Sequence, residues 1–244
     1  MQKSIYIGTS GWHYKHWRGP FYPPTLATKA WLGYYAEHLH CVEINNSFYR
    51  LPLPTTLTGW YHQTPPGFLF AVKAWRQITH RKRLLACTDP VQTFLPRIQT
   101  LGEKCGPMLF QLPPNFRCSP ERLADFLALL PREQRFAFEF RDPSWHNHTV
   151  YELLAEHNTA FCIFELAGFL SPFTCTADFV YIRLHGPNGP YRGTYDARTL
   201  HGWAERLRQW RGQGKDVYLF FDNDEAGFAV QNALDLQHRV EATG

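Results

Sequence analysis

Six short apolar runs in this chain end in charged or amide side chains, and in most of them the polar residues are two positions apart. Side chains along a β-strand alternate between its two faces, so residues spaced in this way point to the same face. Strands that are apolar along most of their length and polar at the carboxyl end are typical of parallel α/β sheets, whose carboxyl edge gathers polar groups from distant segments. The polar residues are Glu43, Asn45, Lys73, Gln111, Glu139, Arg141, Arg183, His185 and Asp222. The pattern predicts a site at one edge of a parallel sheet.

Strand-like and helix-like stretches alternate along the whole chain. The predicted strands are Ser4–Gly8, Cys41–Asn45, Phe68–Ala74, Pro107–Leu112, Arg135–Arg141, Ala160–Phe164, Phe179–His185 and Asp216–Asp222. The sixth strand–helix unit has the weakest pattern. A repeated strand–helix order implies parallel strands, and 244 residues suit one barrel. We therefore expect α/β architecture with one domain over residues 1–244, a single (β/α)8 TIM-type barrel. An open doubly wound sheet is the rival, but the Gly-rich turn of its dinucleotide-binding form is missing.

Composition limits the classes of protein to consider. The chain is 44% hydrophobic, 19% charged and 16% aromatic, which describes a globular protein and excludes a disordered or collagen-like one. A formal charge of +4 permits an anionic ligand without requiring one. The six cysteines contain no CxxC pair, so we expect neither a zinc site nor a disulfide framework, and we expect no cofactor. With no signal peptide pattern and no membrane-length apolar run, the protein is expected to be cytoplasmic, without a membrane partner.

Two long loops are expected on the carboxyl face, because each follows a predicted strand. They run over residues 9–28 and 186–198 and mix aromatic residues with Lys, Arg and His. Loops in this position are usually functional, and flat rings beside basic groups suit bases or sugars next to phosphate. A short basic run, His80-Arg81-Lys82-Arg83, is expected to be the solvated start of a helix.

Three interpretations of the strand-end residues compete. In the first, Lys73, Arg141 and Arg183 hold a phosphate or carboxylate, while Glu43 and Glu139 orient these cations through ion pairs. A salt-bridge network that only caps the barrel is the structural alternative. Burying so many charges without a ligand to organise is a costly way to stabilise a fold, which favours a ligand.

The second interpretation assigns acid–base catalysis to carboxylates, namely Glu139, Glu43 and Asp222, with loop tryptophans stacking on sugar rings. The third places a divalent metal on Glu43, Glu139, His185 and Asp222. Only one histidine lies at a strand end, and the intermingled Lys and Arg would repel a cation, so no metal is expected.

Eight multi-residue motifs, in order along nearly the whole chain, resemble the YecE-like family of unknown function. They are IGTSGW, WRGPFYP, VEINNSFYRLP, FAVKAWRQITH, GPMLFQLPPNF, AFEFRDPSW, YIRLHGPNGPYRGTY and LFFDNDEAGFAVQNAL. The resemblance implies a TIM-type barrel similar in architecture to xylose isomerases and endonuclease IV. It also implies a carboxyl-face groove lined by Trp12, Asn45, Lys73, Gln111, Arg141, Arg183 and His185 together with the carboxylates Glu43, Glu139 and Asp222.

Similarity to endonuclease IV suggests nucleic-acid binding, although a shared fold is not a shared function. This chain lacks that enzyme's several strand-end histidines, which argues against metal-dependent cleavage. The leading hypothesis is therefore a metal-free groove that binds a phosphate-bearing ligand, either nucleic acid or a phosphorylated small molecule. The alternative is a hydrolase or isomerase that acts on a sugar-like substrate through paired carboxylates, and a catalytically silent scaffold is a third, plainer option.

Overall fold

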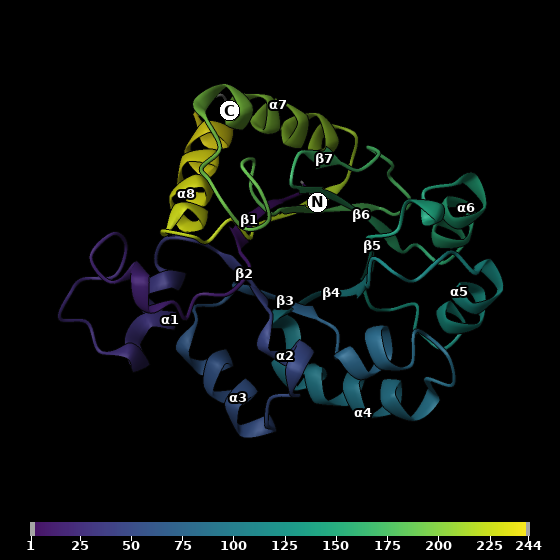
Figure 1. Cartoon of the computed structure of the whole chain (residues 1–244). Coiled ribbons are helices and arrows are strands. Elements are labelled where there is room, and N and C mark those ends of the chain that lie inside the picture. The colour runs from purple at the N-terminus through teal and green to yellow at the C-terminus, as the bar shows by residue number, and fades with distance from the viewer. Residues whose placement is uncertain (1–2, 243–244) are drawn as a thin grey trace.

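The structure is a computed structural model that describes residues 3–242, and it contains a barrel of parallel strands surrounded by helices (Figure 1). In hydrogen-bonding order the strands are β1 (Ile5–Thr9), β9 (Asp216–Phe221), β8 (Phe179–Leu184), β6 (Ala160–Leu166), β5 (Phe136–Phe140), β4 (Cys105–Leu112), β3 (Leu69–Lys73) and β2 (Cys41–Ile44). A short strand, β7 (Phe169–Leu170), pairs antiparallel with β6. The expected α/β barrel is confirmed, and the strand boundaries agree with the sequence pattern to within about two residues.

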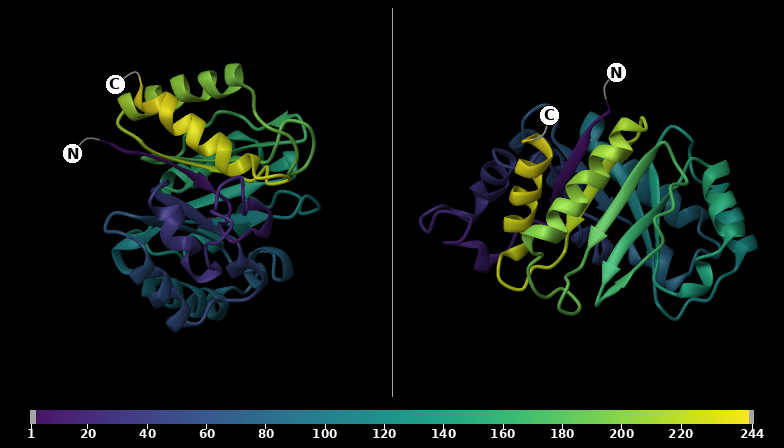
Figure 2. Two further views of the ribbon diagram at one scale, coloured as in Figure 1. Left: turned by 90° about the vertical axis from the view of Figure 1, so that its left-hand side faces the viewer. Right: turned by 90° about the horizontal axis from the view of Figure 1, so that it is seen from above.

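The helices are α1 (Trp31–Ala36), α2 (Asn46–Tyr49), α3 (Pro54–Gln63), α4 (Thr88–Ile98), α5 (Pro120–Leu127), α6 (His148–Glu156), α7 (Ala197–Gly212) and α8 (Phe228–Glu241). Figures 1 and 2 show α7 and α8 side by side on one side of the barrel, with α3 and α4 on the opposite side. Outward-facing strand residues such as Val72, Phe138 and Leu219 are fully buried against this helical layer. None of the helices in the described part of the chain is both long and apolar enough to cross a membrane.

The barrel closes between β1 and β2 without a continuous hydrogen-bonded ladder. An isolated parallel bridge joins Ser10 to Glu43. The hydroxyl of Tyr35, on α1, fills the remaining seam: the Thr9 amide donates to it over 3.1 Å, and it donates to the Cys41 carbonyl over 2.9 Å. Gly8 permits the close approach, because a Cβ atom there would lie 2.2 Å from the Cys41 carbonyl oxygen. The first and last strands in the sheet order are thus joined largely through a side chain.

The sixth strand–helix unit departs from the repeating pattern. Between β6 and β8 the described chain forms no helix, and a tight hairpin to β7 takes its place. The two turn residues, Ala167 and Gly168, have φ angles of 52° and 80°. Positive φ at both central positions is the requirement of a type I′ hairpin turn. This local turn explains why the sequence in this unit gave a weak helical pattern.

Candidate functional site

The inner face of the barrel has an apolar layer and, toward the carboxyl ends of the strands, a polar layer. The apolar layer includes Cys41, Ala71, Leu109, Ala137, Tyr181 and Phe220. Two positions after each of these residues lies a polar one, in the order Glu43, Lys73, Gln111, Glu139, Arg183 and Asp222. The alternation of side chains along a strand therefore brings polar residues from six strands or strand ends to one level of the barrel.

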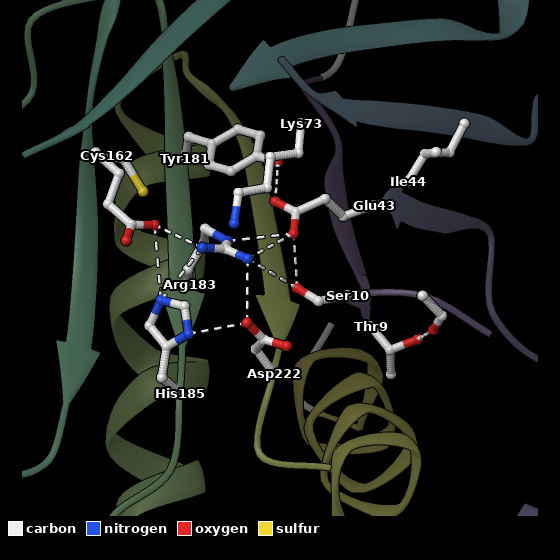
Figure 3. Close-up of polar contacts among 12 residues, drawn as sticks. Thr9, Ser10, Glu43, Ile44, Lys73, Cys162, Tyr181, Arg183, His185 and Asp222 are labelled. Atoms are coloured by element: carbon white, nitrogen blue, oxygen red, sulfur yellow. Dashed lines mark hydrogen bonds and ion pairs between the residues drawn. The ribbon is translucent and has the colours of Figure 1, made fainter. Parts of the chain in front are cut away.

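Arg183 lies at the centre of this polar layer (Figure 3). Its side chain is 1% exposed, and its guanidinium donates to three carboxylates: Glu43 at 2.8 Å, Glu139 at 2.7 Å and Asp222 at 3.1 Å. All three guanidinium nitrogens have partners. Arg183 is therefore occupied by the protein itself and presents no donor to a ligand, in contrast to the phosphate-binding role expected from the sequence.

Glu43 and Glu139 are fully buried, and both oxygens of each carboxylate have partners. Beyond its bonds to Arg183, Glu43 accepts from the Ser10 hydroxyl at 2.7 Å and from the Tyr181 hydroxyl at 2.7 Å. Glu139 accepts from the Nε of Arg141 in addition to Arg183. Burial by itself raises the pKa of Glu139, but Arg141 and Arg183 outweigh it and hold the pKa well below its usual range. Glu139 is therefore ionised and engaged at neutral pH.

His185 and Asp222 form a hydrogen-bonded pair beside Arg183. His185 Nδ1 lies 3.0 Å from Asp222 Oδ2, while Nε2 lies 3.2 Å from Arg141 and 3.3 Å from Arg183. Guanidinium nitrogens only donate, so Nε2 must accept and the ring proton is assigned to Nδ1, where it donates to Asp222. The side chain of Asp222 is 16% exposed, whereas that of His185 is fully buried. Asp222 is thus the carboxylate of the layer with access to solvent.

Lys73 points into the polar layer but is not tied to it (Figure 3). Its ammonium lies 4.8 Å from the centre of the Phe48 ring, and within residues 3–242 it makes no hydrogen bond or ion pair. The pKa of Lys73 is lowered to about 8: burial is the largest cause, the positive charge of Arg183 acts in the same direction, and nearby carboxylates oppose both. A desolvated ammonium without a partner is ready to accept an anion or to release its proton.

Arg141 is a second cation with unused hydrogen-bonding capacity. Its Nε donates to Glu139 and its Nη2 to His185, while no residue of the described chain accepts from Nη1. The side chain is 11% exposed and lies over the Phe164 ring at 5.6 Å. It therefore belongs both to the buried network and to the surface that a ligand would meet.

The remaining expected site residues lie around the edge of the layer. Gln111 lies on β4, points inward and donates to the backbone carbonyl of Leu112 at 2.8 Å. Asn45 is the residue after β2, adjacent in register to Lys73, because Ile44 pairs with Val72. Trp12 is only 8% exposed and packs edge-on against Trp60, with ring centres 5.0 Å apart. Trp12 therefore has little exposed ring surface for the stacking expected of the loop tryptophans.

A basic segment that the sequence analysis did not assign to the site lies at its edge. Instead of starting a helix, the run from His80 to Arg83 lies on a π-helical turn (Gln77–Arg81) and the loop after it, just beyond β3. Three residues of this loop, Arg83, Leu84 and Ala86, have φ angles of 48°, 67° and 48°. Such strained backbone and π-helical turns are frequent near functional sites.

The electric field at this edge can be judged from His80. Burial and four neighbouring cations together lower the pKa of His80 to about 4, with burial the largest cause. In decreasing order of effect they are Lys73, Arg76, Arg141 and Arg83. The Nε of Arg76 is also buried without a hydrogen-bond partner among the residues that the structure describes. The rim beside β3 and β5 is therefore strongly positive, whereas the layer below it is internally neutralised.

Other residues of the network were not singled out from the sequence. Ser10 and Tyr181 bond Glu43, and Tyr14 donates from its hydroxyl to the Ser10 carbonyl at 2.5 Å. Ser10 lies two positions after Gly8 and Tyr181 two before Arg183, so the same two-residue spacing contained the signal. In residues 3–242 no group of three or more His, Cys, Asp or Glu side chains is arranged to hold a metal ion.

Comparison with solved structures agrees with this architecture. A DUF72 family protein from Thermotoga maritima superposes with a TM-score of 0.87 at 29% identity, covering 98% of this chain and 99% of that one. A DUF72 family protein from Enterococcus faecalis gives a TM-score of 0.83 at 20% identity, covering 97% and 95%. A D-psicose 3-epimerase from Clostridium cellulolyticum shares the fold alone, with a TM-score of 0.52 at 11% identity and coverage of 97% and 96%.

Sequence comparison leads to the same group. The UPF0759 protein YunF of Bacillus subtilis is 28% identical over 95% of this chain and 93% of its own length. The UPF0759 protein YecE of Escherichia coli is 35% identical over 58% of this chain and 50% of its own length. The family model described as "Protein of unknown function DUF72" matches residues 6–244. The expected YecE-like resemblance is confirmed, and the chain belongs to the DUF72 family.

Proposed function

We propose that this protein binds a phosphate-bearing ligand, a nucleotide or a nucleic acid, at the carboxyl face of the barrel and without a metal ion. In this proposal Lys73 and Arg141 contact the phosphate. Arg183 acts indirectly. Its ion pairs with Glu43, Glu139 and Asp222 hold the polar layer next to Lys73 and Arg141 in place. The ligand-contacting cations are therefore two of the three that the sequence pointed to.

The single observation that carries the proposal is the contrast between the two levels of the site. Below, Arg183 and its carboxylates satisfy one another. Above, within the described residues, the Lys73 ammonium and the Arg141 Nη1 have no hydrogen-bond acceptor. A desolvated ammonium without a counter-ion and an unused guanidinium donor are unfavourable, and an oxyanion with several acceptor oxygens removes that cost.

Aromatic side chains at the same rim favour a nucleotide over a bare phosphate. Phe48 lies under the Lys73 ammonium, and the adjacent Tyr49 is 70% exposed on α2. Arg83 and Arg122 both lie over the Phe116 ring, at 5.8 Å and 5.5 Å. The Phe116 ring is 5% exposed, so the ring open to a base at this rim is that of Tyr49. An exposed ring beside cations is a combination used for single-stranded nucleic acids.

The competing hypothesis, a hydrolase or isomerase with paired carboxylates, has less support from the geometry. A catalytic acid or base must exchange a proton with the substrate. Glu43 and Glu139 are buried with every oxygen bonded, so neither can do so without breaking the network. Asp222 keeps Oδ1 without a partner in the described chain and is the one predicted catalytic carboxylate with the access this chemistry needs.

Salt-dependent binding tests the proposal. Fluorescent oligonucleotides and nucleoside monophosphates are titrated into the protein at several salt concentrations, and the same titrations are made with Lys73→Met, Arg141→Ala and Arg132→Ala. Arg132 is exposed in the loop before β5, at the opposite end of the barrel, and serves as the matched control. We expect binding to weaken with salt, and each of the first two variants to reduce the salt slope by about one. Salt-independent binding, or full binding by both variants, refutes the proposal.

A further inference from the structure

We infer that the cavity between the first long loop, α1 and α3 is a nucleobase subsite, which rests on the proposed function and specifies its ligand. The cavity has a volume of about 470 Å³, within the usual range for small-molecule sites. Its walls include the aromatic residues Trp12, Tyr14 and Trp60 and the amide residues Asn45, Asn46 and Gln63. None of its described lining residues is acidic, so it suits a neutral ring better than a cationic one.

Asn45 supplies the most specific observation. Its Oδ1 is buried and has no hydrogen-bond partner among the described residues. Although Asn45 precedes α2 at the N-cap position, its side chain makes no capping bond. A buried acceptor without a donor is rare in native proteins and costs free energy until a donor arrives. Asn45 lines the cavity, and in this proposal a ring N–H or exocyclic amine of a base supplies the missing donor.

The cavity adjoins the proposed phosphate site. Ile44 of β2 pairs with Val72 of β3, and Asn45 and Lys73 are the next residues along the two chains. Their backbones are therefore neighbours at the carboxyl edge of the barrel. Tyr14 lies between the cavity and the polar layer, since it lines the former and donates to the carbonyl of Ser10, whose hydroxyl bonds Glu43. A single ligand could therefore place a ring in the cavity and a phosphate at Lys73, with Tyr14 between them.

The chemistry of the walls favours a planar heterocycle over a sugar. Side-chain amides both donate and accept, and they can pair with the mixed donor and acceptor edge of a base. Rings such as Trp60, half-buried at the wall, offer apolar contact to a flat partner. Lys29 supplies one further cation at the lining.

Calorimetric titration of the full chain distinguishes base recognition from phosphate recognition. The probes are the four ribonucleoside 5′-monophosphates, ribose 5-phosphate and inorganic phosphate. We expect the best nucleotide to bind at least tenfold more tightly than ribose 5-phosphate. The Asn45→Leu variant should lose most of that ratio while it keeps its affinity for ribose 5-phosphate. Gln92→Leu, an exposed amide on α4, is the matched control and should change neither.

The outcomes separate the two ideas. Equal binding of ribose 5-phosphate and of every nucleotide overturns the base subsite and leaves the phosphate site standing. Failure of every phosphate-bearing probe to bind overturns the base subsite, and failure of the oligonucleotides as well overturns the phosphate site. A tenfold nucleotide preference that Asn45→Leu leaves intact also contradicts the assignment of this cavity. The wild-type comparison requires no variant and decides the first point even if Asn45→Leu does not fold.

Discussion

Arg183 holds Glu43 through two nitrogens, with Nη2 at 2.8 Å and Nε at 3.2 Å from the same carboxylate oxygen, in a pair that is at most 1% exposed on either side. Removing one partner of such a buried pair leaves the other charge without compensation, which typically costs about 3–5 kcal/mol. We therefore expect Arg183→Met to lower the free energy of unfolding by about that amount, measured by urea denaturation.

The exposed pair of Arg192 and Glu225 offers a matched control. Their side chains are 71% and 48% exposed at a separation of 3.9 Å. Surface pairs contribute roughly 0–1 kcal/mol, so Arg192→Met should be nearly neutral. If Arg183→Met is as mild as the control, Arg183 does not hold the polar layer together.

Lys73 should make ligand binding depend on pH between about 7 and 9. Its pKa is lowered to about 8, chiefly by burial, so the ammonium form that attracts phosphate is lost as the pH rises through that value. A charged hydrogen bond is worth about 1.5–3 kcal/mol, so affinity should fall about tenfold or more across this window. Calorimetry of nucleotide binding at several pH values measures the change.

Lys73→Arg separates charge from other effects of pH. A guanidinium stays protonated throughout the window, so the affinity of this variant should stay nearly constant from pH 7 to 9. The phosphate group itself is already doubly ionised above pH 7 and does not titrate there. A wild-type profile as flat as that of Lys73→Arg would show that Lys73 does not contact the ligand.

His80 should make the fold sensitive to mild acid. Burial and neighbouring cations lower its pKa from 6.5 to about 4 in the folded state. Below pH 6.5 the unfolded chain binds a proton that the folded chain does not, so stability falls as the pH drops from about 6.5 to 4. His80→Gln should therefore lose less stability than the wild type between pH 7 and 5, as followed by thermal unfolding.

An exposed histidine provides the comparison for this effect. His201, on α7, has a side chain that is 62% exposed beside Glu205. His201→Gln should retain the acid sensitivity of the wild type. Identical pH profiles for His80→Gln and the wild type would contradict the positive field that we assign to the rim.

Tyr35 should matter to barrel closure through its hydroxyl alone. Tyr35→Phe removes the group that accepts from Thr9 and donates to Cys41, leaving buried backbone groups unpaired at a cost of about 1–3 kcal/mol. We expect that loss in urea denaturation, together with faster hydrogen exchange of the Thr9 amide. Tyr34→Phe, on the same helix, is the control because the Tyr34 hydroxyl makes no hydrogen bond within residues 3–242. Equal stability of the two variants would indicate that the seam does not need this side chain.

The inward direction of the polar residues was predictable because it follows from a local rule. Alternation along a strand places Glu139 on the same side as Ala137, and Arg183 on the same side as Tyr181, whatever the rest of the fold does. The parallel barrel was predictable for a related reason, since strand–helix repetition determines strand direction. These properties depend on near neighbours in the sequence.

Which cations have all their donors occupied by the protein, and which keep a free donor, was not predictable in this way. Arg183 and Arg141 have similar sequence surroundings, yet one is saturated by three carboxylates and the other retains a donor. That difference depends on distances between residues far apart in the chain. The partner of Asp224 was not predictable either, because Asp224 accepts from the Trp17 indole at 2.6 Å, and Trp17 lies far away in the sequence.

The hydrogen-bonded polar layer around Arg183 has a consequence for the entropy of ligand binding. Its side chains are held in single rotamers by Glu43, Glu139 and Asp222 before any ligand arrives. Association therefore has to order only the few rim side chains, such as Lys73, and immobilising each of these costs about 0.5–1.5 kcal/mol. Under the proposed function, this rigidity lowers the entropic cost for a small phosphorylated ligand, which makes few contacts to offset that cost.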